Sequence, residues 1–186
     1  MDTIDIADFP VKFEWDGGPS PIGLHNTVLS LQPVMDKLMA GGFISPRESF
    51  GFAMANPGVD YSKCWNDPSK LIAFVNYWGP DGPRYAANAV RKIRAAAREG
   101  KDTQAIRLQC PELFQDEVEQ TDPSIETAGV FPWGDFPFDG AVFVNCIDLR
   151  LLGAVSAYPK EQDPVVASLV LGLIGLDMNQ ISRSAA

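Results

Sequence analysis

The segment from Gly134 to Ala167 constrains the fold more than any other part of the chain. It begins with an apolar turn that contains Gly and Pro and continues with two runs rich in β-branched residues. The runs 141–147 and 151–157 are separated by a turn-sized interval, which predicts an antiparallel hairpin. An acidic helix start and an apolar helix follow them.

A second hairpin and further helices complete the expected architecture. The runs 50–55 and 71–78 are apolar and bounded by turn residues, so we expect them to pair as an antiparallel hairpin with a long loop. Helical spacing of apolar residues marks 26–39 and 84–99. Asp163-Pro164 fit the N-cap and first position of the last helix, where we assign them no chemistry. This order of elements predicts an α+β protein whose antiparallel sheet is flanked by helices.

The first 24 residues differ from the rest of the chain. They show little periodicity and many Pro and Gly residues around the aromatic residues Phe9, Phe13 and Trp15. We expect an extended arm over residues 1–24 that packs on the core or on a neighbouring subunit, followed by one domain over residues 25–186. Because a free tail would not normally keep so much apolar area exposed, we predict a homo-oligomer.

Charge and composition argue against several classes of function. The formal charge of −9 disfavours binding to phosphate backbones, so no nucleic-acid partner is expected. The acidic N-terminus is unlike a signal peptide, and the apolar run Val165–Leu176 is shorter than the ~20 residues of a membrane span. We therefore expect a cytosolic protein with no membrane partner. Three distant cysteines and one histidine predict free thiols and no metal site.

The helix over 84–99 places its charged and apolar residues on different faces. At ~100° per residue, its alanines gather opposite a basic face. The basic face consists of Arg84, Arg91, Arg94, Arg98 and Lys101. It fits either a solvated helix surface or an anion site. Lys92 lies at the border of this face beside Tyr85, and it is either a surface lysine or a residue that reaches a cleft.

Four short motifs occur in an order that resembles a known family. Residues 89–96 read Ala-Val-Arg-Lys-Ile-Arg-Ala-Ala, with Thr103 after them, and residues 134–138 read Gly-Asp-Phe-Pro-Phe. Residues 153–158 read Gly-Ala-Val-Ser-Ala-Tyr, and residues 162–167 read Gln-Asp-Pro-Val-Val-Ala. Together these motifs resemble the GlcG/HbpS-like family, whose members are often described as haem-binding or haem-degrading.

The resemblance covers about residues 26–176 and carries three expectations. It implies a profilin-like antiparallel sheet of about five strands with helices on its faces. It also implies a tendency to oligomerise, and it makes haem a candidate ligand. Asp135 stands where the family has a glycine, and Tyr158 where a small residue is usual.

The turn Gly134–Phe138 and the N-terminal half of the 84–99 helix are expected to form a cleft. Asp135 lies among aromatic residues, which favour a protonated carboxyl and so permit general acid or base catalysis. Alternatively, it accepts backbone N–H bonds within the turn. Lys92 would bind a carboxylate or enolate in the same cleft, or pair with Asp135. The aromatic candidates for ligand contact are Tyr85, Trp133, Phe136, Phe138 and Tyr158.

His25 is the only histidine, and it is a candidate catalytic residue or haem ligand, or else a capping or packing residue. The chain has no G-x-S-x-G motif, Walker loop or G-x-G-x-x-G motif. Two functions stay open. The first is a binding or accessory protein for a small, partly aromatic or anionic ligand. The second is a small cofactor-free enzyme of proton transfer, hydration or hydrolysis that uses Asp135, His25 or Lys92.

Overall fold

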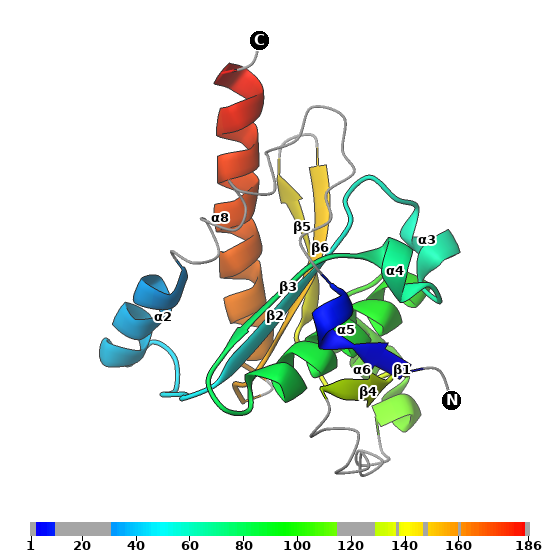
Figure 1. Cartoon of the computed structure of the whole chain (residues 1–186), viewed down its shortest axis with the longest axis horizontal. Helices are drawn as coiled ribbons and strands as arrows, with labels where there is room; N and C mark the ends of the chain where they lie inside the picture. The colour runs from blue at the N-terminus through cyan, green and yellow to red at the C-terminus, as the bar shows by residue number, and fades with distance from the viewer. Residues whose placement is uncertain are drawn as a thin grey trace.

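A computed structural model of the chain has a mixed α+β fold with two antiparallel sheets (Figure 1). The residues that it describes are 3–9, 31–114, 129–136, 138–146, 149–159 and 161–184. The main sheet has the strand order β3-β2-β6-β5. Its strands are β2 (Phe50–Ala55), β3 (Ile72–Trp78), β5 (Ala141–Cys146) and β6 (Leu149–Ser156). A small second sheet pairs β1 (Thr3–Asp5) with β4 (Val130–Pro132).

Both predicted hairpins are confirmed. β2 pairs with β3, so that Phe50 lies opposite Trp78, and β5 pairs with β6, so that Ala141 lies opposite Ala154. The central pair β2–β6 joins the two hairpins into one sheet. Within the described part of the chain this sheet has four strands, and the expected single sheet of about five strands is not found.

The three long helices lie close to their predicted positions. They are α2 (Leu31–Ala40), α5 (Gly82–Glu99) and α8 (Asp163–Ser184). Gly100 ends α5 in a left-handed conformation, which is common for glycine at a helix C-terminus. Four short elements were not predicted from the sequence: α3 (Tyr61–Cys64), α4 (Pro68–Leu71), α6 (Thr103–Gln109) and the 3-10 turn η1 (Ile6–Asp8). A further 3-10 turn, η2 (Pro111–Phe114), follows α6.

Helices α5 and α8 cover opposite faces of the main sheet, and α2 lies on the α8 side (Figure 1). The alternation of side chains along β2 explains this arrangement. Phe50, Phe52 and Met54 belong to the hydrophobic cluster under α8, whereas Ala53 and Ala55 belong to the cluster under α5. The α8 face therefore holds large side chains, and the α5 face holds small ones.

Small residues let α5 approach the sheet closely. A Cβ atom at Gly51 would lie 2.2 Å from the backbone of both Tyr85 and Ala86. Since α5 contributes mainly alanines to the interface, little side-chain volume separates helix and strands. This packing fixes the height of α5 above the sheet.

The described part of the N-terminal arm packs on the core of its own chain. Ile4 and Ile6 are buried in the cluster under α5, and β1 pairs with β4. Residues 10–24 of the predicted arm lie outside the described residues. The arm over residues 3–9 is therefore part of the fold.

Two further properties of the described residues concern cysteines and membranes. Cys64, Cys110 and Cys146 are free thiols, as predicted. Within the described ranges, no helix combines the length and the apolar character needed to cross a bilayer.

We predict that Gly51→Ala lowers the free energy of unfolding by about 2–3 kcal/mol, because the added methyl group meets backbone rather than a movable side chain. Denaturant unfolding at constant m-value measures the change. Gly172→Ala on α8 is the matched control. A Cβ there meets nothing within 4 Å, so this substitution should stabilise by about 0.5–1 kcal/mol. Equal effects of the two substitutions would contradict the close packing of α5.

Candidate functional site

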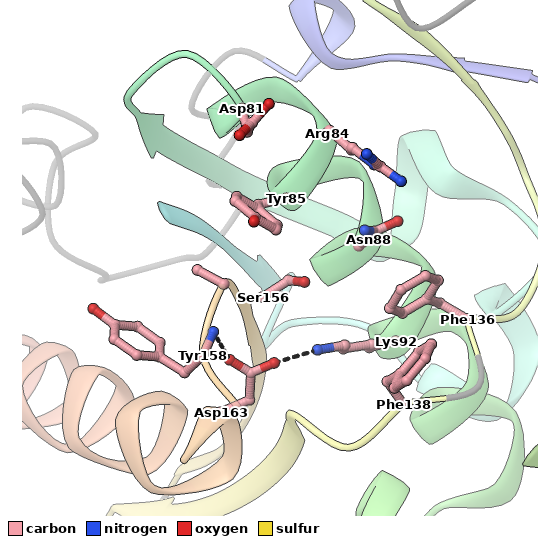
Figure 2. Close-up of a pocket in the computed structure, with 11 residues that line it drawn as sticks. Asp81, Arg84, Tyr85, Asn88, Lys92, Phe136, Phe138, Ser156, Tyr158 and Asp163 are labelled. Atoms are coloured by element: carbon pink, nitrogen blue, oxygen red, sulfur yellow. Dashed lines mark hydrogen bonds and ion pairs between the residues drawn. The ribbon is translucent and has the colours of Figure 1, made fainter. Parts of the chain in front are cut away.

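A cleft of about 510 Å³ lies between α5, the end of β6 and the start of α8 (Figure 2). Its walls combine aromatic rings with a few polar groups. The lining residues are Asp81, Arg84, Tyr85, Asn88, Lys92, Phe136, Phe138, Ser156, Ala157, Tyr158 and Asp163. Five of the residues predicted to contact a ligand are among them: Tyr85, Lys92, Phe136, Phe138 and Tyr158.

The floor of the cleft is a buried ion pair between Lys92 and Asp163 (Figure 2). The Nζ atom of Lys92 donates to Oδ2 of Asp163 at 2.7 Å and to the backbone carbonyl of Val155 at 2.9 Å. Oδ1 of Asp163 accepts from the backbone N–H of Tyr158 at 2.9 Å. Lys92 is only 1% exposed, so the prediction of a surface lysine is wrong.

The local backbone leaves room for this pair. Gly140 has a φ of +136°, and a Cβ there would lie 2.7 Å from Nζ of Lys92. The buried hydroxyl oxygen of Thr103 accepts from the backbone N–H groups of Gly140 and Ala141 at 3.0 and 3.1 Å. α6 thus holds the glycine in place through Thr103.

Burial shifts both partners of the ion pair toward their neutral forms. It lowers the pKa of Lys92, and the negative charge of Asp163 opposes this shift. It also raises the pKa of Asp163, and the positive charge and hydrogen bond of Lys92 oppose that shift. Each group therefore depends on the other for its charged form, and losing one partner would leave a buried charge uncompensated.

Phe136 and Phe138 form an aromatic wall beside the ion pair. Their ring centroids are 4.8 Å apart at an interplanar angle of 37°. The ring of Phe136 also lies 5.6 Å from Nζ of Lys92 and 5.3 Å from the guanidinium of Arg91. Two cations of α5 thus face this ring, an arrangement that stabilises its position.

Two neutral polar side chains of the cleft have no partner among the described residues. Asn88 is 9% exposed and Ser156 is 5% exposed, and neither side chain hydrogen-bonds to any described residue. Both residues line the cleft, and neither contributes to the fully buried unpaired side-chain atoms of the described residues, so their polar groups face the solvent in the cleft. These two groups are therefore available to a ligand.

Asp135 does not line the cleft. Its carboxylate pairs with Arg94 and Arg98 of α5, and its backbone carbonyl accepts from Arg91 at 2.9 Å. The predicted pairing of Asp135 with Lys92 is therefore wrong, because the partner of Lys92 is Asp163. The expected apolar environment of Asp135 is also wrong, since its carboxylate faces two guanidinium groups.

Arg91, Arg94 and Arg98 fasten the aromatic turn to α5 and form what we call the arginine ladder. Besides its bond to Asp135, Arg91 donates to the carbonyl of Gly134 at 3.3 Å. Arg94 lies 5.0 Å from the ring of Trp65 and 5.3 Å from that of Trp133. The basic face of α5 is therefore neither a fully solvated surface nor an open anion site. Trp133 is buried behind the ladder and does not line the cleft.

His25, the predicted catalytic histidine, lies outside the described residues. Among the described residues, no group of three or more His, Cys, Asp or Glu side chains could hold a metal ion. The described residues that line the cleft include no His, Cys or Met. Tyr158 lines it, but in Figure 2 its hydroxyl points away from Lys92.

Sequence reasoning missed Asp163, Asn88 and Ser156. The sequence predicts a helix cap at Asp163, whereas in the structure Asp163 is the first residue of α8 and binds Lys92. Asn88 had a detectable signal, because Tyr85, Asn88 and Lys92 follow a spacing of three and four residues, which places them on one side of a helix. Ser156 had no such signal.

No known family model, curated protein or solved structure matches this chain.

We predict that Asp135→Ala lowers the melting temperature by a few degrees, because the ladder loses its carboxylate and partly exposed ion pairs contribute about 1 kcal/mol or less each. The side-chain NMR signals of Phe136 and Phe138 should broaden as their turn loosens. Glu99→Ala is the control, since it removes a carboxylate from Arg98 without touching the turn. Identical spectra for Asp135→Ala and Glu99→Ala would contradict this role of Asp135.

We predict that Tyr158→Phe removes part of the loss of stability at alkaline pH. Burial raises the pKa of Tyr158 from 10.0 to about 12. The unfolded chain therefore releases this proton first, and the free energy of unfolding falls between pH 10.0 and about 12. The fall should amount to at most about 1.4 kcal/mol per pH unit.

At neutral pH the same substitution should be neutral or stabilising, because the buried hydroxyl of Tyr158 has no partner among the described residues. Urea unfolding from pH 8 to pH 12 tests both effects. Equal alkaline slopes for wild type and Tyr158→Phe would contradict the prediction.

Proposed function

We propose that this protein is a cytosolic binding or accessory protein for a small, partly aromatic or anionic ligand. The observation that carries the proposal is the cleft in which Asn88 and Ser156 lie unpaired beside an aromatic wall. Its volume of about 510 Å³ falls within the range of ligand pockets, roughly 300–1,000 Å³. Such pockets are mostly apolar and carry a few convergent polar groups, as this one does.

The motifs that resemble the GlcG/HbpS-like family favour the same cleft as the binding site. Lys92 and Asp163 belong to two different motifs of the resemblance, and they form the floor of the cleft. A profilin-like fold and a homo-oligomer stay predictions that rest on the resemblance and, for the oligomer, on the apolar arm. Both are compatible with an α+β chain whose main sheet is covered on both faces.

The described part of this cleft offers few side chains that could hold haem iron. Haem iron is held by a His, Cys, Met or Tyr side chain. The lining residues offer only Tyr85 and Tyr158 of these types, and the hydroxyl of Tyr158 points away from the floor (Figure 2). The proposal therefore does not depend on haem, and a role of His25 as its ligand stays a prediction.

A second function, a small cofactor-free enzyme of proton transfer, hydration or hydrolysis, is favoured by one observation. Lys92 donates a hydrogen bond of 2.7 Å to Asp163, and both side chains are buried. Burial lowers the pKa of the lysine and raises the pKa of the aspartate. Perturbed pairs of this kind occur at catalytic sites and also in structural ion pairs. In this alternative the pair beside the ligand, rather than Asp135, would donate or accept the proton.

A fragment screen tests the binding proposal. Small aromatic compounds added to ¹⁵N-labelled protein should shift the amide signals of residues that line the cleft, including the side-chain NH₂ of Asn88. Phe138→Ala should weaken the best fragment at least fivefold with little change in melting temperature, because this ring is only partly buried. Phe43→Ala is the matched control, since Phe43 is exposed and does not line the cleft.

The proposal is contradicted if no fragment shifts the cleft signals, or if Phe43→Ala weakens binding as much as Phe138→Ala. Conversion of a bound fragment in the same samples would favour the enzyme. In that case Lys92→Met should abolish conversion, and the melting temperature of the variant would show whether the protein still folds.

A further inference from the structure

We propose that the part of the ligand that enters this cleft is uncharged. It is an aromatic ring that bears a neutral group able to donate and accept hydrogen bonds, such as a carboxamide. This inference rests on the proposed binding function and narrows its ligand class. Three observations support it: the charge balance of the floor, the chemistry of the unpaired side chains, and the position of the aromatic wall.

The charges on the floor of the cleft already cancel. Lys92 and Asp163 carry opposite charges and lie 2.7 Å apart, and both are almost completely buried. Arg84 and Asp81 also carry opposite charges, but both side chains are exposed at the mouth. Among the described residues that line the cleft, no buried cation lacks a partner, so a carboxylate entering it would lose its hydration without compensation. If the carboxylate of a ligand displaced Asp163 from Lys92, the buried negative charge of Asp163 would lose its partner instead.

The unpaired side chains suit a neutral group. The amide of Asn88 offers an N–H donor and a carbonyl acceptor, and the hydroxyl of Ser156 both donates and accepts. A carboxamide has the same two functions and can satisfy the donor and the acceptor of Asn88 at once. A carboxylate only accepts, so a bound carboxylate would cover the carbonyl oxygen of Asn88 without donating a hydrogen bond to it.

The aromatic wall determines the other half of the ligand. Phe136 and Phe138 lie beside Lys92, on the side of α5 that also carries Asn88 (Figure 2). A ring attached to the carboxamide would pack against these rings while its polar edge faces Asn88 and Ser156. Aromatic pairs of this kind gain affinity beyond the area that they bury.

The test uses 2-naphthamide and 2-naphthoate, which have the same ring system and differ in one functional group. Titration at pH 7.5 into ¹⁵N-labelled protein should show naphthamide binding at least tenfold more tightly than naphthoate. Naphthamide should also shift the side-chain NH₂ signal of Asn88. A backbone amide serves as a second reporter at Ser156.

Two variants and one control assign the preference to these side chains. Asn88→Ala should weaken naphthamide at least fivefold and reduce the difference between the two compounds. Ser156→Ala should do the same to a smaller extent, and it keeps the test decisive if Asn88→Ala does not fold. Asn145→Ala should change neither affinity, because Asn145 is exposed on β5 and does not line the cleft.

Naphthoate binding as tightly as naphthamide overturns the inference but leaves the binding function in place. If neither compound binds, the inference is also overturned, and the fragment screen then tests the binding function separately. If only charged fragments shift the cleft signals, the function stands and this ligand class is wrong. If no fragment does so, both proposals fall.

Discussion

The buried ion pair between Lys92 and Asp163 is the interaction on which the rest of the site depends. It joins α5 on one face of the main sheet to the first residue of α8 on the other, and the carbonyl of Val155 on β6 completes it. Three elements thus meet at one ammonium group. Breaking one partner of such a pair typically costs about 3–5 kcal/mol, because the other charge stays buried. The elements around the cleft are therefore held in fixed relative positions by their own electrostatics.

The sequence predicted the elements of this fold better than their contacts. Apolar and β-branched runs bounded by turn residues located both hairpins, and helical spacing located the three long helices. Short helices such as α6 were not predicted, because seven residues give too little periodicity to detect. The pairing of β1 with β4 was not predicted for another reason, since contacts between segments far apart in sequence leave no local pattern.

Lys92 and two aromatic residues of the turn, all singled out in the sequence, line the same cleft. The partner of Lys92 differs from the one considered in the sequence. The sequence suggested Asp135 as one possible partner of Lys92, because it lies among the aromatic residues, and suggested only a cap at Asp163. The sequence alone does not show which carboxylate the lysine meets, because the rotation of α5 decides between them. That rotation directs Lys92 toward the sheet and α8, and it directs Arg94 and Arg98 toward the turn.

Two sets of ion pairs hold the walls of the cleft: the Lys92–Asp163 pair at the floor and the pairs of Asp135 with the arginine ladder. They differ in their access to water, and they should therefore respond differently to ionic strength. The ion pair of the floor is almost completely buried, whereas the carboxylate of Asp135, which pairs with the arginine ladder, is about one-third exposed. Mobile ions screen exposed charges over roughly 8–10 Å at physiological salt and reach buried ones much less. Rising salt therefore weakens the attachment of the aromatic wall while the floor stays intact. The cleft has one part whose position depends on the solution and another whose position does not.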